Sequence, residues 1–452
     1  MGEEPARQHE QNHRMTTSTH LLRQRRFLPL FLTQLLNALN DNLYKNAMVL
    51  FVVYQVYDSP ETETFISGIA TAVFVLPFVL FSATAGQLAD MRDKTKIIRW
   101  IKFAEIIIMS VGATGLVLAA RGMQVDLLAI PLLFAALFAM GVHSTFFGPI
   151  KYAILPQHLK KDEVLAGTGL VEAGTYVAIL SGMILSAVFS VTQSTVAVMA
   201  IALVGYATCR FVPSAPAQCE DAKVDWNPIS ASKSLVAFSM GNIELRYSVL
   251  AISYFWAIAA ILGVQFFPLA KNVLLADKQV AMVMLVAFSA GIAIGSVAIN
   301  ALLKGDISAR YSAKSVLVMG GLLITFYLLC RAWNLQPSGE LFTVTEFLVQ
   351  PLALALTANL LLIAVAGGMF VVPLYAFLTT RVDKSEASRS VAANNFISSL
   401  FMVVGAGVAG ALGFFGIPLE EQLLVSLILC LFAALLARKL HATEALRAPD
   451  FD

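Results

Sequence analysis

The sequence predicts an all-α membrane protein with twelve transmembrane helices in two six-helix halves. The chain of 452 residues divides into roughly a dozen apolar runs, each long enough to cross a bilayer core of about 30 Å as a helix. Hydrophobic residues make up 58% of the chain, charged residues make up 13%, and the mean hydropathy is +0.76. A soluble protein of this length has no core large enough to bury so much apolar surface. Because lipid cannot satisfy backbone hydrogen bonds, we expect the chain to be helical almost throughout.

The predicted spans are apolar segments separated by short polar connections, in which the basic residues gather. They are 27–57, 65–89, 97–120, 126–148, 164–190, 192–212, 246–270, 279–303, 313–333, 353–378, 388–415 and 418–437.

Lysine and arginine are distributed unevenly between alternate connections. About 25 of them fall in the two tails and in the connections after the second, fourth, sixth, eighth and tenth spans. The other connections hold four, namely Arg121, Lys271, Lys278 and Arg331. Since cytoplasmic loops carry the excess of Lys and Arg, this pattern predicts cytoplasmic termini and an even number of spans.

The longest basic connection, 213–245, separates six spans from six and contains a weakly amphipathic stretch from Trp226 to Phe238. The first apolar run is too long for the apolar region of a signal peptide, so we expect no cleaved leader. Met15 is an alternative start to Met1. The predicted units are a cytoplasmic tail 1–26, a bundle 27–212, the central loop 213–245, a second bundle 246–438 and a cytoplasmic tail 439–452.

The ends of the fourth and tenth spans align at an offset of 224 residues. The offset carries Pro149 onto Pro373, Lys160 onto Lys384 and Asp162 onto Glu386. Parallel six-helix repeats about an axis along the membrane normal are the architecture of the major facilitator superfamily. The alternative is a chance agreement between two proline-containing helix ends with basic loops.

The connection after the second span reads GQLADMRDKTK from Gly86 to Lys96, which resembles the major facilitator loop signature G-x-L-a-D-r-x-G-r-k. Gly86 would allow two helices to approach closely, and Asp90 could face the positive N-terminus of a neighbouring helix. Basic residues such as Arg92 would hold the cytoplasmic ends together in one conformer. Asp93 replaces the usual Gly, so the turn must be made differently. A plain basic turn is the structural alternative.

The first span is unusually polar for a membrane helix. Asp41 and Lys45 lie four residues apart, so they share a helix face and can partly neutralise each other. Charges at membrane depth cost at least about 2.5–3.5 kcal/mol each on insertion scales. One interpretation is a self-compensating pair with Asn residues that join helices. We favour a polar cluster that lines a central cavity, because packing alone does not require so many costly groups.

Other ionisable residues inside the spans have less specific interpretations. Lys102 is expected to extend its amine to the cytoplasmic surface along its apolar stem. Glu172 has no local partner, so it is either a helix-to-helix hydrogen-bond acceptor or a cavity residue. His143 is more typical of a satisfied core residue than of a proton carrier. Two further candidates are Glu105 in the third span and Arg246 at the start of the seventh.

Several short blocks are spread from residue 27 to about residue 415. They are FLTQ at 31–34, NDN at 40–42, FGPIKY at 147–152 with IL at 154–155, GLVEA at 169–173, ELRYS at 244–248 leading to FW at 255–256, GGMFVVPL at 367–374 and NNF at 394–396. Together these blocks resemble the LplT-type lysophospholipid transporters of the major facilitator superfamily. The resemblance implies movement of lysophospholipids across the bacterial inner membrane towards the cytoplasmic leaflet, where they are reacylated.

The resemblance also implies which residues meet the substrate. It places Asp41, Lys151 and Arg246 near the lipid headgroup, where the two cations suit a phosphate and the carboxylate suits an ethanolamine ammonium. Phe and Met residues would line a path for the acyl chain, although they also suit a lipid-facing surface. The predicted substrate-binding residues are Asp41, Asn42, Lys45, Lys151, Tyr152, Glu172, Arg246, Asn394 and Asn395, and the predicted switch-loop residues are Gly86, Asp90 and Arg92.

The sequence contains no enzymatic motif. The acyltransferase signature H-x-x-x-x-D is missing, since His158 precedes Asp162 by four positions, and no P-loop is present. Cys209, Cys219, Cys330 and Cys430 form no C-x-x-C and have no His at metal-ligand spacing. We therefore expect free thiols, no catalysis, no cofactor and no metal. The net charge of +2 gives no reason to expect nucleic acid.

Besides the lysophospholipid and the bilayer, a cytoplasmic acyltransferase is a candidate partner, because related proteins carry one fused to the transporter. The chain is expected to be a monomer. One alternative function is proton-coupled export of drugs or metabolites, with Asp41 and Glu172 as protonation sites. Another is a scaffold without transport activity that recruits an acyltransferase through 213–245.

Overall fold

The computed structural model describes residues 20–52, 60–218, 224–337 and 341–446. These residues form helices and connections, with one isolated β-bridge between Ala276 and Phe342. The prediction of an all-α fold is confirmed. The long helices are α3 (Leu28–Phe51), α4 (Pro60–Met91), α5 (Lys94–Ala120), α6 (Ile130–Ala153), α8 (Val164–Val188), α9 (Val191–Cys209), α11 (Ile243–Asn272), α12 (Lys278–Leu303), α13 (Ser312–Arg331), α15 (Pro351–Thr380), α16 (Ala387–Phe414) and α17 (Leu419–Leu446).

Within the described ranges, eleven of these long helices are apolar enough to cross a membrane, so the chain is a multi-pass membrane protein. Helix α3 is the exception because its polar residues lower its hydropathy. Its 24 residues correspond to about 36 Å, a length that suits a span. A total of twelve spans, with α3 as the first, is therefore consistent with the structure and stays a prediction. The end of the first predicted span, beyond Val52, lies outside the described residues.

Short helices occupy several connections. They are the π-helix η2 (Val125–Ala129), α7 (Leu155–His158), α10 (Pro228–Gly241), α14 (Val344–Leu348) and the 3₁₀-helix η3 (Lys384–Glu386). Asn227 caps α10 by accepting hydrogen bonds from the amides of Ile229 and Ser230. The amphipathic stretch expected in the central loop therefore forms a helix.

The turn between α4 and α5 shows how Asp93 replaces the signature glycine. Its carboxylate accepts hydrogen bonds from the amides of Thr95 and Lys96, at 2.8 and 3.1 Å, and so caps the N-terminus of α5. Aspartate is among the preferred N-cap residues because its side chain satisfies amides that the helix leaves unpaired. A capped helix start thus takes the place of a glycine turn.

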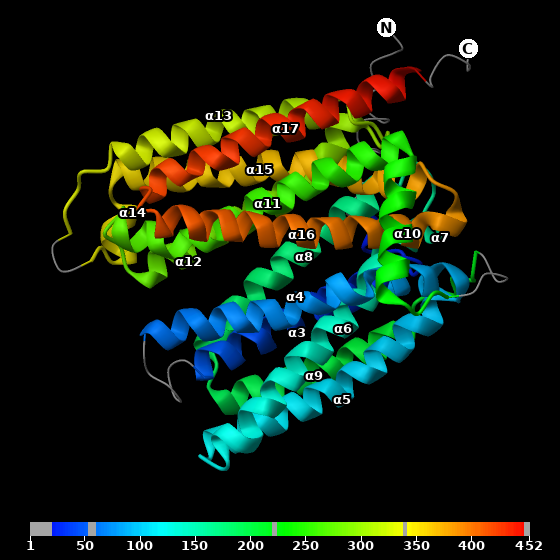
Figure 1. Cartoon of the computed structure of the whole chain (residues 1–452), viewed down its shortest axis with the longest axis horizontal. Coiled ribbons are helices and arrows are strands. Elements are labelled where there is room, and N and C mark those ends of the chain that lie inside the picture. Colours follow the sequence, from blue (N-terminus) through cyan, green and yellow to red (C-terminus); the bar gives the residue numbers. More distant parts are fainter. Residues whose placement is uncertain (1–19, 53–59, 219–223, 338–340, 447–452) are drawn as a thin grey trace, which may run out of the picture.

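The two halves pack their helices in the same pattern. In the first half, α3 packs on α8 and α9, α5 packs on α6 and α9, and α4 packs on α6. In the second half, α11 packs on α16 and α17, α13 packs on α15 and α17, and α12 packs on α15. Figure 1 shows the first half below the second. Pro149 and Pro373 lie inside α6 and α15, the fourth long helix of each half.

The halves meet through α4 against α16 and α8 against α12. A Cβ atom on Gly169 of α8 would collide with the backbone oxygen of Ser296 on α12. A Cβ on Gly86 of α4 would likewise meet the side chain of Ala392 on α16. Glycine at these two positions lets the helix backbones approach closely.

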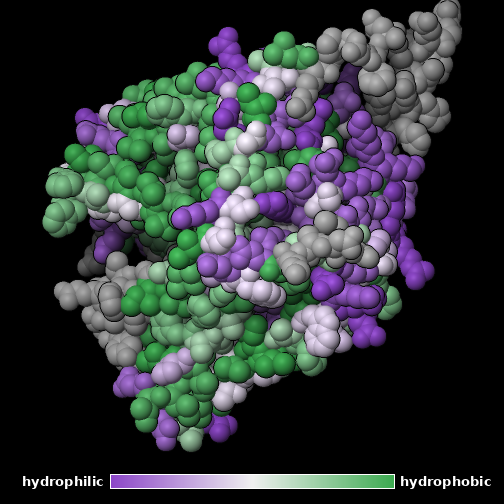
Figure 2. Space-filling model, turned by 45° about the vertical axis from the view of Figure 1, so that its right-hand side comes forward, coloured by the Kyte–Doolittle hydropathy of each residue, from purple (hydrophilic) through white to green (hydrophobic). Residues whose placement is uncertain are grey.

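Hydrophilic residues gather at one end of the molecule. Figure 2 shows them on the right-hand side, the end at which α7 and α10 lie in Figure 1. We call this the basic end; it consists of the connections 92–93, 154–163, 304–311 and 381–386 and of the described parts 210–218 and 224–242 of the central connection. The predicted excess of Lys and Arg therefore lies on one side of the apolar bundle.

Candidate functional site

A central cavity of about 280 Å³ lies between the two halves. Helices α3, α4, α6 and α8 of the first half line it together with α11, α15 and α16 of the second. Its polar lining residues are Gln34, Asn37, Asp41, Asn42, Ser144, Lys151, Tyr152, Glu172, Thr175, Trp256, Tyr375, Asn395, Ser398 and Ser399. The polar residues of the first span that are expected to line a central cavity include Asp41 and Asn42, and both line this one.

Helix α3 presents one polar face to this cavity. Gln34, Asn37 and Asp41 are spaced three and four residues apart, which places them on the same side of a helix. Asp41 is buried and accepts hydrogen bonds from the Ser144 hydroxyl and, at 3.3 Å, from the Asn37 amide. Its second carboxylate oxygen, Oδ1, has no hydrogen-bond partner in the described structure. The carboxylate is therefore held in place with capacity for a further donor.

Lys151 and Glu172 form the second charged group of the cavity. The Lys151 amine lies 3.5 Å from the Thr175 hydroxyl and 4.9 Å from the centre of the Tyr152 ring. Glu172 accepts a hydrogen bond from the Tyr152 hydroxyl. Among the ion pairs described, none joins Lys151 to a carboxylate within 4.0 Å, although Glu172 lines the same cavity and interacts with the amine electrostatically.

The second half supplies neutral groups to the cavity. The Trp256 indole donates to the Tyr375 hydroxyl at 2.9 Å. The Tyr375 ring stacks on Tyr152, with centroids 4.8 Å apart and planes at 14°. This aromatic stack joins α15 to α6 across the boundary between the halves. Aromatic pairs of this kind contribute about 0.5–1.5 kcal/mol beyond their buried area.

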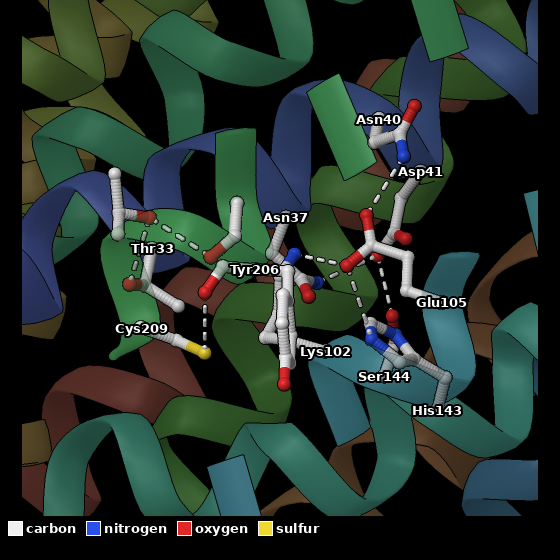
Figure 3. A network of polar contacts seen from close by, with 12 residues as sticks. Thr33, Asn37, Asn40, Asp41, Lys102, Glu105, His143, Ser144, Tyr206 and Cys209 are labelled. Atoms are coloured by element: carbon white, nitrogen blue, oxygen red, sulfur yellow. Dashed lines mark hydrogen bonds and ion pairs between the residues drawn. The ribbon is translucent and has the colours of Figure 1, made fainter. Parts of the chain in front are cut away.

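Behind Asp41 lies a buried ionic network in the first half (Figure 3). Glu105 pairs with Lys102, accepts a hydrogen bond from the Asn40 amide at 2.7 Å, and lies 3.4 Å from His143 Nε2. The prediction that Lys102 extends to the surface is wrong, because its side chain is fully buried. The partner three residues away offsets the cost of burying the amine, and His143 is a core residue of this network.

The structure places the predicted substrate-binding residues in two groups. Asp41, Asn42, Lys151, Tyr152, Glu172 and Asn395 line the cavity, whereas Lys45, Arg246 and Asn394 are not among its lining residues. The Lys45 amine lies 5.6 Å from the Phe74 ring centre, and no ion pair between Lys45 and Asp41 is among those described. Arg246 lies in the first turn of α11 at the basic end, over the Tyr247 ring. The roles of these residues in binding stay predictions.

Some lining residues were missed from the sequence. Gln34, which accepts a hydrogen bond from Thr175 at 3.1 Å, could have been found from its helical spacing with Asn37 and Asp41. Trp256 and Tyr375 have no comparable spacing with other polar residues, because their helices are apolar on most faces. Such helices give little indication in the sequence of which face points inward.

Asp90 connects the two halves at the basic end. Its carboxylate accepts hydrogen bonds from the backbone amides of Ser388, at 3.0 Å, and Arg389, at 2.9 Å. These amides belong to the first turn of α16, where the helix dipole favours a negative charge. The expected contact of Asp90 with a neighbouring helix N-terminus is therefore present, whereas Arg92 is exposed. We call the contact of Asp90 with Ser388 and Arg389 the α4–α16 latch.

The sequence model of the Major Facilitator Superfamily matches residues 30–360. The chain belongs to the Major Facilitator Superfamily. Its all-helical fold, its repeated packing and its cavity between two halves are those of a secondary transporter.

Curated relatives of this facilitator are named lysophospholipid transporters LplT. The protein of Escherichia fergusonii is 26% identical over 395 residues, which cover 85% of this chain and 88% of that protein. The protein of Escherichia coli O1:K1 is 27% identical with the same coverage.

Solved structures of other transporters share the fold. The human organic anion transporter MFSD10 (TETRAN) matches with a TM-score of 0.72 at 14% identity, over 91% of this chain and 99% of that one. A bacterial homologue of the iron transporter ferroportin in an outward-facing state matches with a TM-score of 0.71 at 12% identity, over 93% of this chain and 100% of that one. At these identities the likeness concerns the fold alone.

Proposed function

We propose that this facilitator moves lysophospholipids across the inner membrane of a bacterium by alternating access. The observation that carries the proposal is the presence of opposite charges in one cavity. Lys151 is in none of the ion pairs described, although Glu172 lies in the same cavity, and Asp41 Oδ1 has no hydrogen-bond partner among the described residues. A lysophospholipid headgroup needs a cation for its phosphate and, in the ethanolamine lipid, an acid for its ammonium. The names of the curated relatives support the same substrate class.

The size and walls of the cavity favour a bound headgroup with the acyl chain outside. A volume of about 280 Å³ is at the lower limit of the roughly 300–1,000 Å³ that small-molecule pockets span, so a whole lipid does not fit. Phe74, Val75 and Phe78 of α4 form an apolar wall beside the polar groups. We infer that the acyl chain leaves the cavity laterally along α4.

Alternating access requires the contacts at the basic end to break. The α4–α16 latch and the close approach of Gly169 to α12 both lie between the cavity and this end, so they close it. Opening would release Asp90 from α16 and expose the cavity to the basic end. In that conformer the cavity opens towards Arg246, which lies at the basic end, so its side chain can contact the headgroup.

We assign the basic end to the cytoplasm, with both termini on that side, because it carries the excess of Lys and Arg. We assign this chain no catalytic step, and we propose that it works as a monomer. Reacylation of the transported lipid would fall to a separate acyltransferase. A scaffold function through 213–245 would instead predict capture of that enzyme without lipid flux.

Proton-coupled export is a second candidate, favoured by the buried carboxylates Asp41 and Glu172 in the cavity. It predicts that transport of a soluble substrate stops when the proton gradient is removed. It also predicts that added lysolipid does not change this transport. Lysolipid flux that persists without a gradient would argue against it.

The deciding experiment is flux in proteoliposomes, measured with labelled lysophosphatidylethanolamine with and without an imposed proton gradient. We expect flux from the wild type and a loss of about 10- to 100-fold in Lys151→Gln, since hydrogen bonds to charged groups contribute about 1.5–3 kcal/mol. The matched control is Lys439→Gln, which removes an exposed charge at the end of α17 and should transport normally. Wild-type flux in Lys151→Gln would remove this lysine from the mechanism, and absence of flux in the wild type would refute the proposal.

A further inference from the structure

A second pocket lies at the basic end of the first half, separate from the central cavity. Its volume is about 510 Å³, and it lies where α3 begins and α9 ends, next to the first turns of α5. It shares no lining residue with the central cavity. The lining residues are Arg25, Arg26, Arg99, Arg210, Phe211, Val212, Pro213 and Ser214. Half of these residues are arginines, so the pocket carries a concentrated positive charge.

Two acids lie beside this arginine pocket, and one of them neutralises one of its four arginines. Glu163 pairs with Arg26 at 2.6 Å. Asp93 caps α5 and accepts a hydrogen bond from the Ser214 hydroxyl at 2.9 Å. Among the ion pairs described, none neutralises the other three arginines, and the Nε of Arg99 is buried without a hydrogen-bond partner. An anion in the pocket would relieve the mutual repulsion of the arginines.

An exposed aromatic strip begins directly beside the arginine pocket. Trp100 is 73% exposed and contacts Phe103, which in turn contacts Tyr206, with ring centroids 6.4 and 6.1 Å apart. The Arg210 guanidinium lies 6.0 Å from the centre of the Tyr206 ring. Aromatic residues gather at membrane–water interfaces, because their rings suit the level of the headgroups. The pocket therefore opens onto a surface that contacts lipid, which favours an amphiphilic anion over a soluble one.

We propose that the arginine pocket binds the phosphate of an anionic glycerophospholipid from the surrounding bilayer, with its acyl chains along Trp100 and Phe103. Basic pockets between transmembrane helices on the cytoplasmic side suit anionic lipid headgroups. All of the binding elements belong to the first half, so the lipid stays attached to one half while the two halves move relative to each other. The site is thus independent of the transport substrate and of the central cavity.

The test uses the fluorescence of Trp100 in the full-length protein, in nanodiscs of phosphatidylcholine with increasing amounts of a brominated lipid. Trp226, Trp256 and Trp333 are replaced by Phe so that Trp100 is the remaining tryptophan. We expect brominated phosphatidylglycerol to quench Trp100 at lower mole fractions than brominated phosphatidylcholine. Arg99→Gln with Arg210→Gln should lower this preference by about fivefold for each arginine removed. Arg25 is exposed and makes no hydrogen bond among those described, so Arg25→Gln alone should lower the preference for phosphatidylglycerol by about fivefold. This single variant provides the test if the double variant misfolds.

The matched control is Arg310→Gln with Lys314→Gln, which removes two cations stacked on Tyr311 at the same end of the second half. This control should keep the full preference for phosphatidylglycerol. An unchanged preference in Arg25→Gln and in a monodisperse Arg99→Gln/Arg210→Gln protein would overturn the proposal. Displacement of the brominated lipid by millimolar inorganic phosphate or glycerol 3-phosphate would also overturn it, since the site would then bind free phosphate.

Discussion

The two halves of this facilitator pack in the same pattern but differ in chemistry. The charged residues of the cavity lining, Asp41, Lys151 and Glu172, all belong to the first half, as does the buried pair of Lys102 and Glu105. The second half contributes aromatic rings, hydroxyls and an amide to the lining. The repeat therefore preserves the helix arrangement and leaves the polar groups free to diverge.

The uneven distribution of charge has a mechanical consequence. Breaking a buried ion pair by removing one partner costs about 3–5 kcal/mol, because a charge is left uncompensated. When two halves rock against each other, charges that interact across the boundary would suffer this cost in every cycle. The charges of the cavity lining all lie in one half and keep their mutual distances, so the uncharged cavity lining of the second half can move past them at lower cost. The following predictions test this division of roles.

The largest effect is expected from the ionic network of the first half. Glu105→Leu leaves the Lys102 amine buried without its partner and should destabilise the protein by about 3–5 kcal/mol. The measurement is the midpoint of thermal unfolding, followed by tryptophan fluorescence. Lys102→Met combined with Glu105→Leu should recover most of the loss, because the paired apolar replacement leaves no orphan charge.

The control for this network is a neutral pair in the second half. The Gln265 amide donates to the Gln422 side chain at 3.0 Å, and both residues are buried. Gln265→Leu removes one neutral hydrogen bond and should cost about 1–3 kcal/mol. If the Glu105→Leu variant has the same unfolding midpoint as the Gln265→Leu variant, or a higher one, the ion pair contributes no more to stability than the neutral hydrogen bond.

A smaller effect, selective for the headgroup, is expected at Asp41. Asp41→Asn removes the charge that would meet an ethanolamine ammonium, so transport of lysophosphatidylethanolamine should fall by about 10- to 100-fold. Transport of lysophosphatidylglycerol, which has no ammonium, should change little. Ser399→Ala in the second half, which removes a neutral hydroxyl from the lining, should affect both lipids equally and by less than about tenfold. Equal losses for both lipids in Asp41→Asn would contradict the assignment of Asp41 to the ammonium.

Part of this arrangement was predictable from sequence, because it depends on local pattern. The loop signature predicted that Asp90 meets a helix N-terminus, and apolar runs predicted the described ends of the long helices to within about five residues, except that α17 ends at Leu446 and not near residue 437. The offset that aligns Pro149 with Pro373 predicted which helices correspond. These features follow from spacing along one segment or from composition.

The failed and missed predictions concern contacts between helices. The length of the Lys102 side chain predicts a surface position for its amine, yet Asn40 of α3 and His143 of α6 complete a buried site around its partner Glu105. Tyr375 and Trp256 lie on helices that are apolar on nearly every face, so the inward direction was not encoded in a hydrophobic periodicity. Which faces meet is decided by packing between segments distant in sequence.

The α4–α16 latch tests how the halves are held together at the basic end. Asp90→Asn weakens a charge–dipole contact worth about 0.3–2 kcal/mol, so it should shift the balance from closed to open by about 2- to 30-fold. The substitution also removes the acid 3.9 Å from the buried Lys94 amine, but that pair lies within the first half, so its loss is expected to lower stability without favouring either conformer. Spin labels at the exposed positions 96 and 384, on opposite halves, would report this as a population at longer distance. Asp93→Asn is the matched control, because Asp93 caps α5 within the first half and should leave the distance distribution unchanged. A distribution in Asp90→Asn identical to that of the wild type would show that packing alone closes this end.

The smallest effect is expected from the neutral side of the cavity. Tyr375→Phe removes the hydroxyl that accepts from Trp256 but keeps the ring stacked on Tyr152, so only about 0.5–1.5 kcal/mol is lost. Transport should slow by about two- to tenfold, equally for the ethanolamine and glycerol headgroups, because no charge is involved. Tyr254→Phe, on α11 and outside the cavity lining, should transport normally. A selective loss for one headgroup in Tyr375→Phe would mean that the second half also reads charge, and the two halves would then share a role that the structure otherwise divides between them.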